Sequence, residues 1–278
     1  MRGDFLAAMA ASSRARSQAA QAVTPARELS ARIADLPAAP KLRLGGFDLI
    51  AEVKLRSPAM GQLKSAAADD LGARVAGYAR AGAAAVSILT EPSRFDGSLE
   101  DLAAGAHALQ PLGVPAMRKD FLVDEYQVLE GRVAGAGGVL AILRMLPRAE
   151  LERLIDTALS LRMFVLLEAF DEPDIALAHE LVAARPKERE LLLVGVNSRD
   201  LVTLQVVPGR LDALAAALPD AVPRVAESGV ATPADAARVA ACGYDLALVG
   251  SALMSGTDPG QLAQSMLAAA RPAARRRA

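Results

Sequence analysis

The sequence holds few of the residues from which metal centres and disulfide frameworks are built. It has two histidines, one cysteine and no tryptophan in 278 residues. The lone Cys242 excludes an internal disulfide framework and fits a reducing compartment, so we expect a cytoplasmic location. His107 and His179 fall in segments with helical patterns, where solvated positions are the ordinary outcome. Two distant histidines and one cysteine cannot build a metal constellation, and we expect no metal site.

No field of one charge sign covers the chain, and no apolar run is long enough to cross a bilayer. The sequence has 31 basic and 32 acidic residues, which gives a net charge of −1. The longest uncharged apolar stretch, at residues 134–143, is much shorter than the ~20 residues of a transmembrane helix. We therefore expect neither a nucleic acid nor a membrane as a partner.

The two ends of the chain differ in composition from the rest. Residues 5–26 carry Arg14 and Arg16 among many alanines and serines and contain no acid, which faintly resembles a transit peptide. An amphipathic helix in front of the main fold is the interpretation that we favour. Residues 271–278 are rich in arginine, and we expect a solvated basic tail there.

What the sequence does have is a series of short apolar runs, which alternate with longer segments rich in alanine and leucine. The segments at 69–81, 124–135, 147–161 and 232–242 have the polar faces of helices, and Thr232 and Pro233 suit a helix start. Strands that are apolar almost throughout are buried on both faces, as in parallel sheets. We expect eight strands, at 47–54, 85–90, 114–119, 138–143, 163–168, 192–197, 223–227 and 245–250.

Eight strand–helix units indicate a closed (β/α)8 barrel of the TIM-barrel type, an α/β fold, rather than an open doubly wound sheet. No glycine-rich dinucleotide fingerprint follows the first strand, which weakens a Rossmann assignment. We expect a single domain over residues 1–278. It would consist of an N-terminal helical extension at 1–46, the barrel at 47–270 and the basic tail at 271–278.

Charged and polar side chains end five of the expected strands, although a buried strand ordinarily ends in apolar or small residues. The carboxyl ends of all barrel strands meet at one face, where the active sites of this fold lie. One such charge would be unremarkable, but five strands together indicate a site. The strand-end residues are Glu52 with Lys54, Arg118 with Lys119, Glu168, Asn197 with Arg199 beyond it, and Glu227 with Ser228.

Glu52 and Lys54 stand two positions apart, so both side chains project to the same side of their strand. With Val53 facing the helices, both would point into the barrel mouth. Burial and mutual attraction can there tune the pKa values of a lysine and a carboxylate for acid–base chemistry. A salt bridge that only plugs the barrel is the alternative for this pair.

A second group of residues suggests a phosphate site. Gly229 follows the seventh strand, and Gly250 and Ser251 follow the eighth. The loops after strands seven and eight commonly bind phosphate in this fold, through backbone N–H groups. Ser57, after the first strand, could add a hydroxyl.

Several stretches of this sequence resemble the indole-3-glycerol phosphate synthase family, from about residue 49 to residue 260. They are IAEVKLRSP (50–58), SILTEPSRFDGSLEDL (87–102), RKDFLVDEYQV (118–128), GVNSRDL (195–201), AESGV (226–230) and LVGSALM (248–254). The resemblance implies a ring closure without a cofactor. Its substrate would be a phosphorylated small molecule, 1-(2-carboxyphenylamino)-1-deoxyribulose 5-phosphate, and its products indole-3-glycerol phosphate, carbon dioxide and water.

The resemblance also implies roles for the strand-end residues. Lys119 would be the general acid for ring closure, and Lys54 would contact the substrate carboxylate and act as acid in the dehydration. Glu168 and Glu52 would be the base and its partner, with the division between them open. The substrate would be positioned by Asn197, Arg199, Glu227 and Ser228, and its phosphate would be held by Ser57, Gly229, Gly250 and Ser251. An aromatic pocket would be lined by Phe95 and Phe121, unless these two residues are ordinary core.

Three places depart from the family pattern. Ala59 and Met60 replace a Ser-Lys-Gly loop, residues 169–171 (Ala-Phe-Asp) replace a His-Asp pair, and the N-terminal segment lacks the usual charged helix. A paralogue that acts on a modified anthranilate is therefore an alternative. A non-catalytic barrel that binds a phospho-ligand is another, although a binder needs no matched acids and bases. The uniform Ala- and Leu-rich helix surfaces leave the oligomeric state open.

Overall fold

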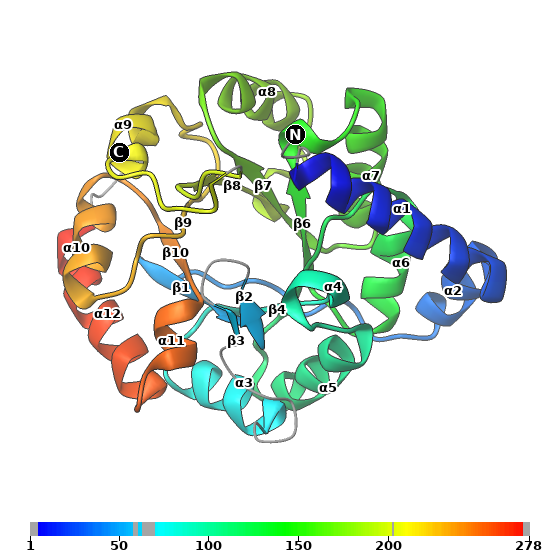
Figure 1. Cartoon of the computed structure of the whole chain (residues 1–278), viewed down its shortest axis with the longest axis horizontal. Helices are drawn as coiled ribbons and strands as arrows, with labels where there is room; N and C mark the ends of the chain where they lie inside the picture. The colour runs from blue at the N-terminus through cyan, green and yellow to red at the C-terminus, as the bar shows by residue number, and fades with distance from the viewer. Residues whose placement is uncertain (1–4, 58–60, 63–69, 202, 275–278) are drawn as a thin grey trace.

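The computed structural model describes residues 5–57, 61–62, 70–201 and 203–274. Its centre is a closed barrel of eight parallel strands in the order β1-β10-β9-β8-β7-β6-β5-β4, which confirms the predicted (β/α)8 fold (Figure 1). The barrel strands are β1 (Asp48–Val53), β4 (Ala85–Leu89), β5 (Ala116–Lys119), β6 (Gly138–Ile142), β7 (Phe164–Ala169), β8 (Leu192–Asn197), β9 (Arg224–Glu227) and β10 (Leu246–Val249). Each lies within two residues of its predicted range.

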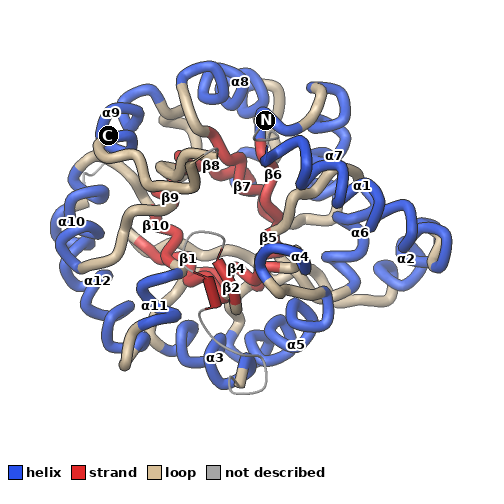
Figure 2. The backbone as a smooth tube through the Cα atoms, viewed as in Figure 1, coloured by secondary structure: helices blue, strands red, loops and turns tan. Residues whose placement is uncertain are grey.

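Helices form a ring around the strands (Figure 2). The predicted helix N-cap at Thr232 is confirmed, because its side chain accepts a hydrogen bond from the N–H of Asp235 and the Asp235 carboxylate bonds back to the Thr232 N–H. The barrel helices are α3 (Leu71–Arg80), α5 (Leu99–Leu109), α6 (Glu125–Val133), α7 (Arg148–Ser160), α8 (Glu172–Ala183), α9 (Arg210–Leu214), α10 (Pro233–Ala241) and α12 (Pro259–Ala273). Shorter elements are α4 (Pro92–Phe95), α11 (Ser251–Ser255) and the small hairpin β2 (Arg56–Ser57) and β3 (Gly61–Gln62).

Alternate residues of each strand point to opposite sides of the barrel wall. Ile50, Met117 and Leu166 belong to the apolar filling of the barrel, whereas neighbours such as Ala51 and Leu167 pack against the helices. Phe164 also lies inside. A Cβ at Gly138 would come within 2.3 Å of the Phe164 ring, so the glycine at this position leaves room for that ring. The interior of the barrel is a packed core, and its polar groups lie at the carboxyl ends of the strands.

The N-terminal segment is helical, as predicted. Helix α1 (Phe5–Val23) lies beside the barrel mouth near α6 and α7, and α2 (Ala26–Ala34) follows it toward the periphery (Figure 1). Leu6 and Met9 join the apolar filling of the barrel, and Ser13 and Ser17 are fully buried. Within the described residues, no helix is both long enough and apolar enough to cross a membrane.

The C-terminal end differs from the expectation of a solvated tail from residue 271. Helix α12 continues to Ala273, and Arg271 donates hydrogen bonds to the Phe47 carbonyl and to Asp48 Oδ1. The last helix therefore reaches three residues beyond the predicted end of the barrel, and its arginine is bound to the start of β1. Residues 275–278 lie outside the described part of the chain.

Candidate active site

A cavity of about 310 Å³ opens at the carboxyl ends of the strands. The residues proposed above for catalysis, substrate binding and phosphate binding lie in its wall, except Ser57. Arg118, the other expected strand-end charge, is not among the described lining residues. Ser57 belongs to β2, but its side chain, like residues 59 and 60, falls outside what the structure describes. The structure thus brings together side chains that are up to 199 positions apart in the sequence, from Glu52 to Ser251. His107 and His179 lie in α5 and α8 and are not among the lining residues.

Glu52 and Lys54 both point into this cavity, as the alternation predicted, and form an ion pair with Nζ 2.5 Å from Oε1. Gly250 on the neighbouring strand makes room for the pair. A Cβ there would lie 2.4 Å from Glu52 Oε1 and 2.9 Å from Lys54 Nζ. Burial by itself would raise the pKa of Glu52, but the ammonium groups of Lys54 and Lys119 outweigh it, and the pKa is lowered. Glu52 is thus an ionised partner for Lys54.

Lys119 ends β5 and lies between two carboxylates, in what we call the inner cluster: Lys119, Glu168, Glu227 and Asn197. Its Nζ is 3.4 Å from Glu168 Oε1 and 3.3 Å from Glu227 Oε2. Asn197 Nδ2 donates to Glu168 Oε1 at 2.9 Å. Burial would lower the pKa of Lys119, but the surrounding carboxylates raise it overall, so the ammonium form persists at neutral pH.

Glu227 is the most enclosed member of the inner cluster, with 1% of its surface exposed. The register of β8 and β9 sets it opposite Asn197. Burial and the neighbouring Glu168 carboxylate raise the pKa of Glu227 well above its ordinary value, although Lys119 opposes them. Its Oε1 has no hydrogen-bond partner among the residues that the structure describes.

Three of the four predicted phosphate-binding residues, Gly229, Gly250 and Ser251, follow β9 and β10, and Ser228, which was predicted to position the substrate, precedes Gly229. Ser228 and Gly229 both have positive φ, at 63° and 74°, so the chain turns sharply at the end of β9. Gly250 and Ser251 mark the turn from β10 into α11, and all four residues line one side of the cavity. Backbone N–H groups in such consecutive turns are the usual donors to a phosphate.

Aromatic rings also form part of the cavity wall. The rings of Phe95 and Phe121 lie 6.2 Å apart, and Phe121 also packs edge-on against Phe5 at 5.7 Å. Phe121 is buried among the apolar residues of the barrel, yet it borders the cavity, so it serves as both core and wall. Phe5 of α1 was missed by the sequence analysis, because no local pattern connects it to Phe121. Leu140, Ile142 and Leu248 were also missed, since they look like ordinary strand residues.

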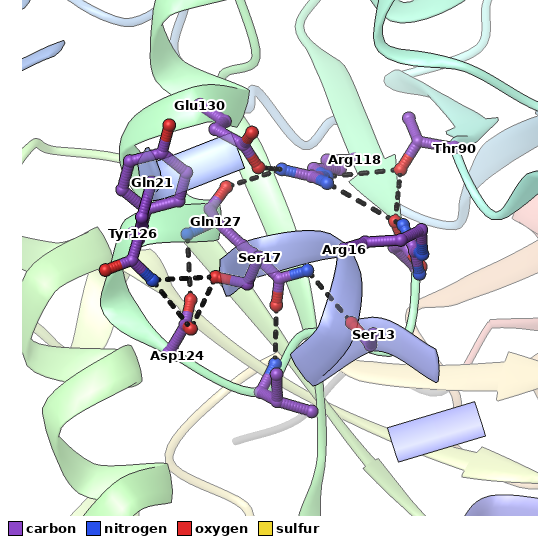
Figure 3. Close-up of polar contacts among 12 residues, drawn as sticks. Ser13, Arg16, Ser17, Gln21, Thr90, Arg118, Asp124, Tyr126, Gln127 and Glu130 are labelled. Carbon is purple, nitrogen blue, oxygen red and sulfur yellow. Dashed lines mark hydrogen bonds and ion pairs between the residues drawn. The ribbon is translucent and has the colours of Figure 1, made fainter. Parts of the chain in front are cut away.

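Arg118, the other predicted charge at the end of β5, points away from the cavity. It belongs to what we call the outer cluster: Arg16, Thr90, Arg118, Asp120 and Glu130. Arg118 donates to Thr90 Oγ1 at 3.1 Å and to the Gln127 carbonyl at 2.6 Å, and it pairs with Asp120 and Glu130 at 3.3 Å each (Figure 3). These contacts tie β5 to α6.

The outer cluster also anchors α1. Arg16 donates to both carboxylate oxygens of Asp120, at 2.8 and 3.1 Å. Next to it, Ser13 Oγ accepts a bond from Gln127 Nε2, and Ser17 Oγ donates to Asp124 Oδ2 (Figure 3). Asp120 borders the cavity directly after Lys119, so α1 is connected to the strand end that carries the inner lysine.

Two solved structures of sugar- and thiamine-phosphate enzymes are similar to this chain in fold. Thiamine phosphate pyrophosphorylase from Pyrococcus furiosus aligns with a TM-score of 0.59 and 15% identity, over 82% of this chain and 96% of that one. A 3-hexulose-6-phosphate synthase aligns with a TM-score of 0.58 and 18% identity, over 80% of this chain and 99% of the other. At such low identity, these similarities support the barrel fold alone.

Sequence comparison is more specific. A profile of the family "Indole-3-glycerol phosphate synthase" matches residues 6–266. The indole-3-glycerol phosphate synthase of a Nocardioides species is 42% identical over 244 residues, which cover 84% of this chain and 89% of the relative. That of Mycobacterium leprae is 38% identical over 259 residues, 93% of this chain and 88% of the relative. The chain belongs to the indole-3-glycerol phosphate synthase family.

Proposed function

We propose that the protein closes the indole ring of 1-(2-carboxyphenylamino)-1-deoxyribulose 5-phosphate to give indole-3-glycerol phosphate, carbon dioxide and water. The observation that carries this proposal is Lys119, an ammonium group held against Glu168 and Glu227 in a cavity whose wall combines charged and apolar side chains. Ring closure needs an acid at the substrate carbonyl and a base for a later proton, and both are within reach of one another here. No step calls for a metal or a cofactor.

The first step is attack of the aromatic carbon on the ribulose carbonyl. Lys119 acts as the general acid, because its raised pKa keeps it protonated and its 15% exposed side chain reaches the cavity. Lys54 contacts the substrate carboxylate, which leaves as carbon dioxide, and then protonates the departing hydroxyl. Glu52 is bonded to Lys54, which favours Glu52 as the partner and Glu168 as the base.

The rest of the cavity suits the remaining parts of the substrate. Phe95, Phe121 and the apolar residues of β6 flank the aromatic ring. Asn197, Arg199, Glu227 and Ser228 face the sugar hydroxyls, while Gly229, Gly250 and Ser251, with Ser57, hold the phosphate. The cytoplasmic location stays a prediction that rests on Cys242, the single cysteine of the sequence.

The direct test is to incubate the purified protein with the carboxyphenylamino-deoxyribulose phosphate and record the indole fluorescence of the product. Fluorescence should grow with time and with enzyme concentration. A folded protein that gives no signal above buffer contradicts the proposed function.

The modified-anthranilate alternative gains little from the described part of the site. Phe170 is 3% exposed, and the Cζ atom of Arg144 lies 5.0 Å from the centre of its ring. Residues 169–171 are not part of the described cavity wall. This departure from the family pattern therefore does not reach the aromatic pocket. A higher kcat/KM for a ring-substituted substrate than for the unsubstituted one would favour the alternative.

A further inference from the structure

The inner cluster contains two buried carboxylates and a single ammonium group. Lys119 Nζ lies 3.4 and 3.3 Å from Glu168 and Glu227, longer than the ~2.7–2.9 Å of a strong charge-assisted hydrogen bond. Lys54 cannot make up the difference, because Glu52 holds it at 2.5 Å. Two carboxylates this close together do not both ionise readily in a buried site.

Among the described residues, the remaining charged groups that line this cavity are engaged by partners other than Glu168 and Glu227. Arg199, beyond β8, donates a guanidinium N–H to the Leu204 carbonyl at 2.6 Å. Asp120, beyond β5, is matched by Arg16 and Arg118. The described cavity-lining residues on β6 and on strand β10 itself are apolar: Leu140, Ile142 and Leu248. The charge imbalance is therefore local to Glu168 and Glu227.

The surroundings of the two carboxyl groups are unequal. Glu168 accepts hydrogen bonds from the Asn197 amide and from Lys119 on its Oε1. Within the described part of the chain, Glu227 Oε1 has no hydrogen-bond partner. It faces the backbone of Gly195, where a Cβ would come within 2.3 Å of it and 3.1 Å of Leu166 Cδ1. An oxygen that faces apolar surroundings and backbone fits a neutral acid better than an anion.

We propose that Glu168 and Glu227 share one proton in the resting protein, that Glu227 holds it, and that it recharges Lys119 in each turnover. The raised pKa of Glu227, caused by burial and by the Glu168 carboxylate, agrees with this geometry. The role in turnover rests on the proposed function, whereas the shared proton does not.

The proton balance of the reaction gives the stored proton a use. Because the substrate loses carbon dioxide from a carboxylate, the whole reaction consumes one proton. Two protons are delivered to the substrate, one to the carbonyl oxygen and one to the leaving hydroxyl, and one proton is removed from a carbon atom. Lys119 delivers the first proton and becomes a neutral amine. Glu227 passes its proton across 3.3 Å to that amine and becomes a carboxylate. Glu168, which takes the proton from carbon, returns it to Glu227, and solvent supplies the net proton through Lys54.

The shared proton can be tested without substrate. The infrared spectrum at pH 7 should contain the carbonyl stretch of a neutral carboxylic acid, and Glu227→Gln should remove that contribution. Glu190→Gln is the matched control, since Glu190 is an exposed glutamate paired with Arg162, and it should leave the band unchanged. A spectrum of Glu227→Gln that keeps the full band of the unaltered protein would overturn the proposal.

The recharging step is tested by comparing the first turnover with steady-state turnover. In Glu227→Gln, Lys119 starts out charged, so a single turnover with enzyme in excess should be slowed far less than kcat, which we expect to fall about 10²-fold. Glu168→Gln should slow both, because the base is missing. Equal slowing of both rates in Glu227→Gln, or no slowing of kcat, would overturn the recharging role. Failure of the unaltered protein to turn over would contradict the proposed function, and the infrared comparison would still decide the shared proton.

Discussion

Arg118 and Lys119 are neighbours on β5, yet their side chains enter two buried charge clusters with opposite character. Arg118 is 2% exposed and makes hydrogen bonds or ion pairs with four groups of the outer cluster and α6. Lys119 is 15% exposed in its side chain and has two carboxylates at the outer limit of a good hydrogen bond. The strand's alternation sends one outward between β5 and α6 and the other into the cavity.

Arg118 is thus a buried charge that stabilises the fold, whereas Lys119 is a buried charge that is available for chemistry. In the outer cluster, the Asp120 carboxylate accepts bonds from Arg16, Arg118, Thr90 and its neighbour's backbone N–H. In the inner cluster, the described residues offer fewer hydrogen-bond donors, and Glu227 Oε1 has no partner among them. A carboxylate that accepts hydrogen bonds on both oxygens, as Asp120 does, is held in its ionised form, whereas an under-bonded one can exchange a proton with a substrate.

The largest effect should come from removing the inner charge. Lys119→Met should lower kcat by about 10²–10⁴-fold, the usual contribution of a general acid, while the fold persists because the freed carboxyl groups can take up protons. Steady-state fluorescence assays and circular dichroism measure the two effects. Lys187→Met, at an exposed lysine, is the control. A mild loss would move the acid role to Lys54.

The corresponding change in the outer cluster should act on stability. Arg118→Met leaves Asp120 and Glu130 short of a partner, and breaking such a buried pair costs about 3–5 kcal/mol in the free energy of unfolding. Urea unfolding measures the loss. Arg80→Met, at an exposed arginine of α3, should cost little. If Arg118→Met left stability intact but abolished turnover, the division between the clusters would be wrong.

A smaller effect is expected at the contact between α1 and the outer cluster. Arg16→Met removes two hydrogen bonds to a buried carboxylate, which we expect to cost about 1–3 kcal/mol and to speed hydrogen exchange along α1. Arg14 offers a control on the same helix, because its pair with Glu150 is exposed and worth at most about 1 kcal/mol. Equal losses from the two substitutions would contradict an anchoring role for Arg16.

The smallest effect, and the one that contrasts the clusters most directly, is in the pH dependence of stability. Because the pKa of Glu227 is raised by folding, the free energy of unfolding should fall as pH rises above about 4.3, the value in the unfolded chain. Burial alone would raise the pKa of Asp120, but Arg16 and Arg118 lower it, so its contribution should be lost as pH falls below about 3.9.

The two slopes can be removed separately. Glu227→Gln should flatten the stability curve on the side above about pH 4.3, and Asp120→Asn should flatten it on the acid side. Thermal or urea unfolding at a series of pH values measures both. Slopes of the same sign for the two residues would show that the clusters are electrostatically alike.

Much of this architecture could be predicted from local patterns. The eight strands follow from short apolar runs, and the inward direction of Glu52 and Lys54 follows from their spacing of two. The Thr232 cap follows from residue type alone. These features depend on neighbours in the chain, so the sequence contains the information directly.

Contacts between distant segments could not be predicted in this way. Arg16 and Asp120 are 104 positions apart, and nothing near either residue indicates the other. The C-terminal arginine at position 271 looked like part of a solvated tail, yet it binds the start of β1 through Asp48. Gly250 and Gly195 leave space for Glu52 and Glu227, a use that appears only when the strands stand side by side.

The sequence by itself determined the barrel, the ring of polar strand ends at one face and the membership of the family. Only the tertiary structure decided which of the neighbouring charges on β5 faces the cavity and how many donors each carboxylate receives. A pKa depends on burial and on the charges within a few ångströms, and in the inner cluster those groups come from β5, β7, β8 and β9. The acid–base character of Lys119 and Glu227 is therefore a property of the closed barrel.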